Sequence, residues 1–371
     1  MTDRLYIRPI ALAESPQSEE GDAVRLAGGL VYASRFALIV RRDGEIVSRQ
    51  RVFAPDMPGA LDQLPDALSE EGQSQWAALQ QARAPLQCGA RTIRLDQPQV
   101  MGILNVTPDS FSDGGQFLDK PDVANAHAAA MLEAGAAIID VGGESTRPGA
   151  AAVWEGDELK RVIPTIERLA ASGAAISVDT RRVAVMEAAL AGGAHVINDV
   201  SALRFDPRSL ELAARSGVPV VLMHAPGAGD DPHADGAYRD VVLDLFDWLK
   251  DRRDAALEAG IAREKILLDP GIGFGKTVAQ NLALLNALPL FHALGAALLV
   301  GASRKRMIGA LSNEAPVHQR LGGSLAMALK ALDAGVQMIR VHDVPETAQA
   351  LQVWRGLRDS ALTDFGQLPA D

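Results

Sequence analysis

The chain has 371 residues and a formal net charge of −11, with 48% hydrophobic but only 4% aromatic residues. This length suits a large barrel with a small appendage, and the composition predicts a mainly aliphatic core. The acidic excess argues against general nucleic-acid binding, which favours a basic surface. Cys88 is the single cysteine, which excludes an intrachain disulfide and cysteine-rich metal sites.

The beginning of the chain predicts no membrane or export signal. Residues 1–10 include Asp3, Arg4 and Arg8 and lack the long apolar run of a signal peptide. No stretch approaches the ~18 consecutive apolar residues that indicate a membrane span. We therefore expect a soluble cytoplasmic protein that has neither a membrane nor a nucleic-acid partner.

Residues 1–96 lack the regular strand–helix alternation of the remainder, and their pattern predicts a small α+β lobe. Segments 36–42 and 45–53 flank Asp43-Gly44, a pair typical of a type I′ hairpin turn. A short helix is expected over 73–83. Three prolines between the hairpin and this helix are expected to interrupt regular structure: Pro55, Pro58 and Pro65. The lobe carries no ligand-like cluster, and its role cannot be inferred from the sequence.

From residue 97 onward, short apolar runs alternate with amphipathic runs. The expected strands are 100–105, 137–142, 175–179, 195–199, 219–224, 266–269, 297–301 and 338–342. The expected helices are 123–134, 157–171, 183–191, 207–216, 241–259, 278–287, 319–334 and 346–357. Eight such units within ~260 residues predict a (β/α)₈ TIM barrel over 97–371. A doubly wound open sheet would also alternate, but it seldom needs eight units.

Polar residues stand at or just after the end of nearly every expected strand. They are Asn105, Asp140, Asp179, Asn198, Asp199, His224, Asp269, Ser303, Arg304, Lys305, Arg340 and His342. In a barrel these ends converge on one mouth, where active sites lie. Helix capping would explain one or two such positions. Their repetition favours a functional mouth.

Two loops after the first and second strands are rich in ligand-like residues. The segment 105–115 contains an asparagine, aspartates, hydroxyls, a phenylalanine and paired glycines, more than a simple turn needs. We interpret it as a loop that closes over a ligand. The segment 140–149 presents Arg147 between Thr146 and Pro148 on a glycine-containing loop. A surface arginine on a polar loop remains the alternative explanation for this second motif.

Carboxylate and amide groups deeper in the expected mouth suit a flat, nitrogen-rich heterocycle. Asp179 can accept paired N–H bonds, and Asn198 can both donate and accept. Asp269 is a further acceptor at the start of a glycine-rich segment. That segment is not a Walker A loop, because Pro270 occupies the position of the first required glycine.

Basic residues at the later strand ends predict an anion site. Lys305 and Arg306 open a helix, whose N-terminus favours negative charge. Arg340 and His342 are two residues apart and so point to the same side of their strand. Arginine suits phosphate through paired N–H donors. His224 is open to two interpretations, a member of the site or a core histidine. No chemistry is assigned to His127, His233, His292 and His318.

Together these motifs resemble the dihydropteroate synthase family of pterin-binding barrels, over roughly residues 97–360. The most specific segments are 105–115, 140–149, 269–276 and 303–305, with Arg340 and His342 completing the pattern. The resemblance implies condensation of 6-hydroxymethyl-7,8-dihydropterin diphosphate with 4-aminobenzoate to 7,8-dihydropteroate and diphosphate. The family's mechanism is dissociative: the C–O bond breaks before the amine attacks.

The resemblance also implies roles for single residues. Asp179, Asn198, Asp269 and Lys305 would hold the pterin edges, and Arg340 and His342 the diphosphate. Asn105 would be the protein ligand of Mg²⁺, the one cofactor implied. Phe111 and Asp113 would act in catalysis with Lys305, and Asp140 would position the loops. Thr146, Arg147, Pro148 and Arg306 would bind the substrates, with Arg306 near the aminobenzoate carboxylate. A homodimer is expected by analogy.

Two departures from the family pattern leave alternatives. Residues 1–96 have no counterpart in the compact bacterial form, and Arg306 stands where some members carry serine. A methyltetrahydrofolate-binding methyltransferase barrel would share the pterin residues but would have little use for the diphosphate cations. A non-catalytic pterin-binding paralogue would not need closing loops. We regard both as alternatives to a synthase.

Overall fold

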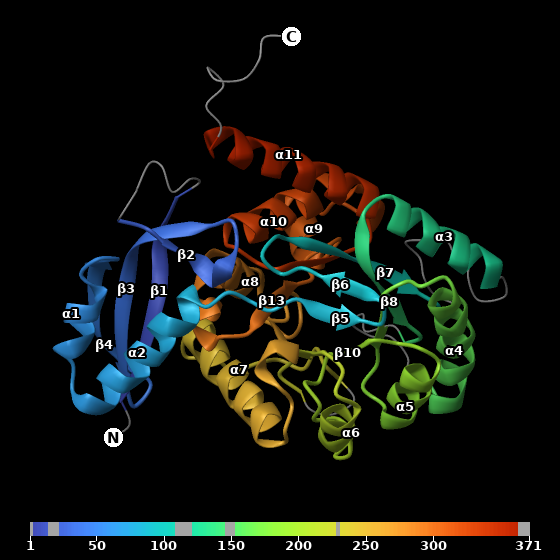
Figure 1. Ribbon diagram of the computed structural model, residues 1–371, viewed down its shortest axis with the longest axis horizontal. Helices are drawn as coiled ribbons and strands as arrows, with labels where there is room; N and C mark the ends of the chain where they lie inside the picture. Colours follow the sequence, from blue (N-terminus) through green and yellow to red (C-terminus); the bar gives the residue numbers. More distant parts are fainter. Residues whose placement is uncertain (1–2, 14–21, 108–120, 145–152, 228–230, 363–371) are drawn as a thin grey trace, which may run out of the picture.

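A computed structural model describes residues 3–13, 22–107, 121–144, 153–227 and 231–362. Its main body is a closed barrel of eight parallel strands, in the order β7-β8-β9-β10-β11-β12-β13-β14. Helices surround this barrel, and a small antiparallel lobe lies at one side (Figure 1). The predicted TIM barrel with an amino-terminal lobe is therefore confirmed.

The barrel strands begin and end within one residue of the expected positions. They are β7 Gln99–Asn105, β8 Ala136–Gly142, β9 Ile176–Asp179, β10 Val196–Asp199, β11 Val220–Met223, β12 Ile266–Asp269, β13 Ala297–Val300 and β14 Met338–Val341. They are nearly continuous apolar runs because helices cover them outside and side chains fill the inside.

The surrounding helices follow the strands in sequence. They are α3 Pro121–Glu133, α4 Glu155–Ala171, α5 Val183–Ala191, α6 Ser209–Ser216, α7 Val241–Glu258, α8 Val278–Ala287, α9 Arg306–Leu311, α10 Leu321–Asp333 and α11 Val344–Leu362. Four short 3₁₀ helices complete the described elements: η2 Leu26–Gly28, η3 Arg263–Lys265, η4 Leu288–Leu294 and η5 Val317–Gln319.

The lobe consists of one sheet and two helices. Its elements are β1 Asp3–Ala13, β2 Val24–Arg25, β3 Tyr32–Arg42, β4 Glu45–Phe53, α1 Met57–Asp62 and α2 Asp66–Gln80. The predicted hairpin is confirmed, and both turn residues have positive φ: 47° at Asp43 and 90° at Gly44, as a type I′ turn requires.

The prolines of the lobe correct one expectation. Pro58 lies in the first turn of α1 and Pro65 is the N-cap of α2, so both stand where helices begin. Proline is tolerated there because the first helical N–H groups lack intrahelical partners. Helix α2 therefore starts at Asp66 and not near residue 73. Strand β1 was not expected from the sequence, and Pro9 is accommodated beside a register shift.

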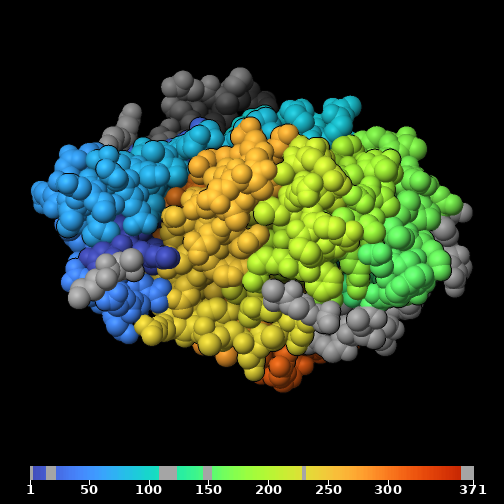
Figure 2. All heavy atoms as spheres, turned by 90° about the horizontal axis from the view of Figure 1, so that it is seen from below, coloured from blue at the N-terminus to red at the C-terminus, as the bar shows by residue number. Residues whose placement is uncertain are grey.

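The lobe packs against the outside of the barrel at α7 and η4. The Tyr6 ring meets the Phe246 ring edge-on at 5.3 Å, and the Tyr6 hydroxyl donates to Asp247 Oδ2 at 2.9 Å. In Figure 2 the blue lobe lies directly against the yellow surface of α7. Lobe and barrel share one continuous hydrophobic core.

A second hairpin closes the amino end of the barrel. Strands β5 Leu86–Cys88 and β6 Arg91–Ile93 pair antiparallel. The side chains of Leu86, Cys88 and Ile93 form one buried cluster with inward residues from the beginnings of the barrel strands. This hairpin precedes the expected boundary at residue 97 but packs with the barrel. The division into 1–96 and 97–371 stays a prediction.

Candidate functional site

A cavity of about 240 Å³ lies at the carboxyl ends of the barrel strands, where the sequence predicts the site. Six predicted site residues line it: Asn105, Asp179, Lys305, Arg306, Arg340 and His342. Three others, Asp140, Asn198 and Asp269, are buried near these residues and bonded into the same strand ends. The barrel thus brings together side chains that are more than 200 residues apart in sequence.

Arg340 lines this cavity and joins two carboxylates, the buried Asp140 and the cavity-lining Asp179. Its Nε donates to Asp140 Oδ2 at 2.6 Å, and its Nη2 donates to Asp179 Oδ2 at 2.5 Å. Asn198 Nδ2 donates to the same Asp140 oxygen at 3.1 Å. Burial alone would lower the pKa of Arg340, but the two carboxylates outweigh it and raise this pKa. Arg340 therefore stays charged and orients both aspartates.

Burial raises the pKa values of the two carboxyl groups that are predicted to accept N–H bonds. It raises the pKa of Asp179 to about 7, opposed by Arg340 and reinforced by Asp140. It raises the pKa of Asp269 to about 6, opposed by the Gly271 N–H, which donates to Asp269 Oδ1 at 2.7 Å. A ligand that donates N–H bonds to these oxygens would favour their ionised forms.

Lys305 lies at the N-cap of α9, after a residue with unusual backbone geometry. Arg304 has φ 58°, a left-handed conformation that is uncommon for a non-glycine residue. Lys305 Nζ lies 4.0 Å from the centroid of the Phe274 ring. Burial, and then repulsion by Arg340, lower the pKa of Lys305 to about 8. Gly273, at φ 86°, leaves room for the lysine stem, since a Cβ there would lie 3.0 Å from Lys305 Cδ.

The structure identifies His224 as a core histidine. Its Nδ1 lies 3.0 Å from Lys276 Nζ, and its ring packs edge-on against Trp248 at 4.7 Å. Burial, then the charge of Lys276, lower the pKa of His224 to about 2. Lys276 also donates to the carbonyls of Gly271 and Phe274, at 2.8 and 3.0 Å. This pair fixes the loop after β12 and does not line the cavity.

Cationic and hydroxyl groups occupy the side of the cavity formed by β13 and β14. Ser303 Oγ lies 3.1 Å from His342 Nδ1, which fixes the imidazole. Arg304 forms an ion pair with Asp343 and is therefore engaged. Arg306 is exposed at the cavity edge. Arg320 also lines the cavity, and its guanidinium donates to the carbonyls of Ala315 and Arg304 at 2.8 and 3.0 Å.

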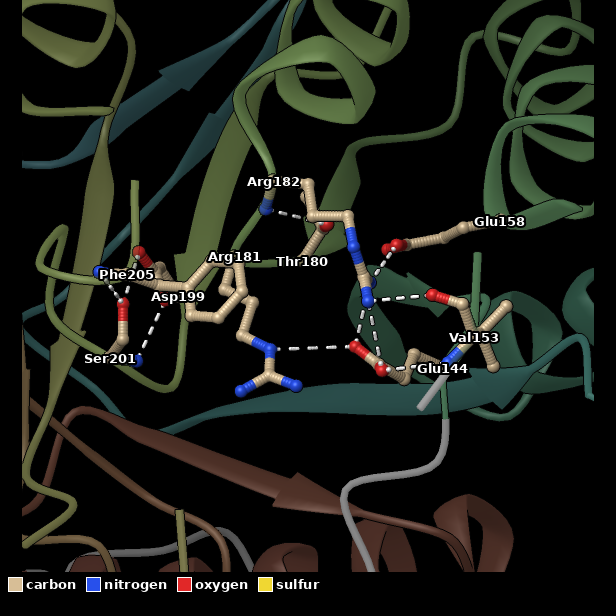
Figure 3. Close-up of polar contacts among 9 residues, drawn as sticks. All are labelled: Glu144, Val153, Glu158, Thr180, Arg181, Arg182, Asp199, Ser201 and Phe205. Carbon is tan, nitrogen blue, oxygen red and sulfur yellow. Dashed lines mark hydrogen bonds and ion pairs between the residues drawn. The ribbon is translucent and has the colours of Figure 1, made fainter. Parts of the chain in front are cut away.

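An ionic network missed at the sequence level ties the two ends of the second loop (Figure 3). Arg182 Nη1 contacts Glu144 Oε2 at 2.8 Å and also Glu158, while Nη2 donates to Val153 O at 2.7 Å. Val153 N donates back to Glu144 Oε1 at 3.2 Å. Arg181 stacks over the Phe205 ring at 4.3 Å and approaches Glu144. Glu144 lines the cavity, so this network borders the site.

Two further residues change their interpretation in the structure. Asp199 is not available to a ligand, because its carboxylate accepts from Ser201 N at 2.7 Å and Leu203 N at 2.9 Å. His233, to which no chemistry was assigned, lines the cavity and stacks on the Phe274 ring with centroids 4.7 Å apart. The only signal in the sequence was its place in the connection after the fifth strand.

Several predicted residues lie outside the described part of the chain. They are Phe111, Asp113, Thr146, Arg147 and Pro148. The first loop is described only as far as Thr107, and the second up to Glu144 and again from Val153. The roles expected for these residues stay predictions.

The described residues contain no group of three or more His, Cys, Asp or Glu side chains that could hold a metal ion. Asn105 lines the cavity and offers one neutral oxygen donor. Mg²⁺ commonly takes one or two protein ligands and completes its shell with phosphate oxygens and water. The donor set therefore fits a magnesium ion that arrives with a diphosphate.

Within the described ranges, no helix is long and apolar enough to cross a membrane.

Fold and cavity together define a TIM-barrel enzyme whose mouth places N–H acceptors beside cations. The sequence matches the family model of pterin-binding enzymes over residues 101–342. It is 47% identical over 281 residues to the dihydropteroate synthase of Neisseria meningitidis serogroup B, covering 74% of this chain and 98% of that protein. Identity to the Escherichia coli K12 dihydropteroate synthase is 49% over 263 residues, covering 71% and 92%.

Solved structures agree with these sequence matches. The Xanthomonas albilineans dihydropteroate synthase with 4-aminobenzoic acid superposes with a TM-score of 0.70 at 47% identity, covering 78% of this chain and 100% of that one. The same enzyme with 7,8-dihydropteroate gives 0.67 at 45% identity, covering 77% and 100%. The chain therefore belongs to the dihydropteroate synthase family of pterin-binding enzymes. The match begins near the barrel, so the lobe is an extension of the family's compact form.

Proposed function

We propose that the chain condenses 6-hydroxymethyl-7,8-dihydropterin diphosphate with 4-aminobenzoate, giving 7,8-dihydropteroate and diphosphate for folate biosynthesis. The observation that carries this proposal is the Asp140–Arg340–Asp179 network. It places buried N–H acceptors and a permanent cation in one cavity, beside Lys305 and His342. A heterocycle with an anionic leaving group needs both kinds of partner.

The buried end of the cavity suits the pterin ring. Asp179 and Asp269 would accept its N–H groups, Asn198 would bond another edge, and Lys305 would donate to a ring acceptor. Because these groups lie at the ends of different strands of one rigid barrel, they are preorganised for a planar ring. The ring nitrogens would draw both carboxylates into their ionised forms.

The cations would stabilise the leaving diphosphate. In a dissociative transfer the bond between the methylene carbon and the bridging oxygen breaks first, and that oxygen leaves with both bonding electrons. Arg340 and His342 would bind the developing charge. Asn105 would hold Mg²⁺, which supplies further positive charge to the phosphate oxygens when bound.

The outer end of the cavity suits 4-aminobenzoate. Its amine nitrogen would attack the methylene cation and then lose a proton. Arg306 would attract the carboxylate, and Thr146, Arg147 and Pro148 of the second loop would shape the pocket around it. Phe111 and Asp113 of the first loop would exclude water and stabilise the cation.

The direct test is an assay of purified protein with Mg²⁺ and both substrates, in which dihydropteroate and diphosphate are quantified together. Equal amounts of both products support the synthase. Binding of pterin diphosphate without turnover would support a non-catalytic paralogue. Binding of methyltetrahydrofolate in its place would support the methyltransferase barrel.

A homodimer is proposed from exposed apolar side chains on the late helices. Val353 and Leu357 of α11 are 60% and 68% exposed, and Leu311 of α9 and Val317 of η5 are 54% and 40% exposed. Helices α9, α10 and α11 lie side by side in Figure 1. Two copies joined across this face would cover them. A cytoplasmic location remains a prediction from the sequence.

A further inference from the structure

The segment 231–240, between β11 and α7, connects the cavity with the amino-terminal lobe. Near its beginning, His233 lines the cavity and stacks on Phe274. At its end, Arg239 reaches the lobe. The lobe itself lies outside the family match at 101–342, so its contacts with this segment are a feature of this chain beyond the barrel.

The first contact is made by the β3–β4 turn of the lobe. Arg239 Nη1 donates to Asp43 O at 3.1 Å. The approach is close enough that a Cβ on Gly44 would lie 2.3 Å from Arg239 Nη1. Gly44 also has φ 90°, a conformation that favours glycine in this turn.

The second contact runs through a shared carboxylate. Arg41, only 7% exposed, bonds Asp244 Oδ1 through Nη2 at 2.6 Å. The other oxygen of Asp244 accepts from the backbone N–H groups of Arg239 and Asp240, at 2.8 and 3.2 Å. Arg41 also donates through Nε to Gly44 O at 3.0 Å. One lobe arginine therefore holds the hairpin turn and, through Asp244, the end of segment 231–240.

The other part of the segment is seated against the loop that carries Phe274. Gly236 N donates to Gly275 O at 3.3 Å. A Cβ on Gly275 would lie 2.3 Å from Ala234 O, so the two backbones are in close contact. Phe274 in turn lies under Lys305 Nζ. A continuous series of contacts thus leads from the lobe to His233, Phe274 and Lys305 beside the cavity.

We propose that the lobe positions segment 231–240 at the mouth of the active site, with Arg41 and Arg239 as positioning residues. His233 is the residue of this segment that would contact the substrate, because it lines the cavity. His233 is partly exposed where it lines the cavity, whereas Asn198 and Asp269 of the proposed pterin site are buried, so we assign 4-aminobenzoate as the affected ligand. This inference rests on the proposed function for the identity of that ligand.

The test compares Arg239→Ala and Arg41→Gln with a matched control, Arg42→Gln. Arg42 neighbours Arg41, but its ion pair is with Asp3, within the lobe. We expect the KM for 4-aminobenzoate to rise about three- to tenfold in the first two variants, with kcat within about twofold of the unmodified protein. The control should keep both values. Equal KM values in all three variants would overturn the proposal.

A double-mutant cycle separates positioning from a general loss of stability. If Arg239 acts through the segment that carries His233, Arg239→Ala should add little to the KM of His233→Ala. Multiplicative effects of the two substitutions would contradict this. Arg239 is exposed, so this variant is expected to fold even if Arg41→Gln does not.

A third readout does not depend on catalysis. Chymotrypsin cleavage after Tyr238 should be faster in Arg239→Ala and Arg41→Gln than in Arg42→Gln, because the segment opens more often. Unchanged cleavage would refute the positioning role. Absence of turnover in the unmodified protein would refute the proposed function and leave the cleavage result to decide the lobe's role.

Discussion

Burial sets the ionisation of Asp179 at the centre of the site, and its pairing with Arg340 opposes this effect. The pKa of Asp179 is raised to about 7, so the folded protein holds a proton there that an ordinary aspartate would lose near its value of 3.8. This carboxyl's contribution to stability is therefore full below the unfolded value and lost as pH rises through about 7. Ligand binding has the opposite preference, because N–H donors favour the carboxylate.

This opposition predicts a pH-dependent affinity for pterin diphosphate. The affinity should rise between about pH 5.5 and 7.5, and binding near pH 6.5 should release a proton. Calorimetry in buffers of different ionisation enthalpy measures both. Asp179→Asn should remove the step near pH 7 and leave the step near pH 6 that belongs to Asp269, whereas Asp269→Asn should retain the step near 7. A flat profile in the unmodified protein would contradict the role of Asp179 as an acceptor.

Lys305 provides a second test at the level of one residue. Its ammonium lies over Phe274 and is predicted to donate to the pterin ring. Lys305→Ala should weaken binding of pterin diphosphate roughly 10- to 100-fold, the effect of losing one charged hydrogen bond. Titration calorimetry measures this loss, and Lys160→Ala on exposed α4 surface is the control. Unchanged affinity would remove Lys305 from the pterin site.

At the level of elements, the network around Arg182 joins β8, α4 and β9 beside the second loop. The side chain of Glu158 is 0% exposed and burial raises its pKa, so Arg182 compensates a charge that water cannot reach. Glu144 and Val153, the described ends of the loop, meet on the same guanidinium. The residues on either side of the loop that carries Arg147 are thus held by the same ionic network.

Arg182→Met should therefore destabilise the protein by roughly 3–5 kcal/mol, because it leaves buried carboxylates unpaired. Urea unfolding measures the change. The matched control is Arg215→Met, which breaks an exposed pair with Glu187 and should change stability by less than about 1 kcal/mol. A similar loss of stability in both variants would show that the Arg182 network contributes no more than an exposed ion pair.

The barrel elements were predictable because their signal is repeated. A polar residue stands at or just after the end of nearly every apolar strand, and an amphipathic helix follows each strand. The hairpin β5–β6 was not predictable, since three-residue strands carry little periodicity and the barrel residues that they pack against are far along the chain. Strand β1 was missed for a similar reason: its pairing with β3 is long-range and passes a proline.

Prediction of the site depended on distance along the chain. Residues at strand ends, such as Asp179 and Arg340, were predictable because barrel topology gathers them. Glu144 and Arg182 were not, because an ion pair between residues 38 apart leaves no pattern in either segment. His233 was missed because a lone loop histidine indicates nothing until Phe274 is seen beneath it.

For the whole molecule, the exposed apolar residues of α11 predict the oligomeric state. Leu357→Glu combined with Val353→Glu should convert the proposed dimer to a monomer in sedimentation velocity experiments, because charges cannot be buried at an apolar interface. Phe53→Glu is the control, since Phe53 is 56% exposed and belongs to β4 of the lobe. A dimer that persists in the α11 variant would place the interface elsewhere.

The central claim is that the cavity transfers a pterin-methylene group from diphosphate to an amine. The most direct measurement uses pterin diphosphate labelled with ¹⁸O at the ester oxygen that joins the methylene carbon to phosphorus. The reaction also contains Mg²⁺ and 4-aminobenzoate, and mass spectrometry follows the label. The account predicts one dihydropteroate per diphosphate, with all of the label in the diphosphate. Label retained in a free hydroxymethylpterin, without dihydropteroate, would show phosphate-ester hydrolysis and contradict the account.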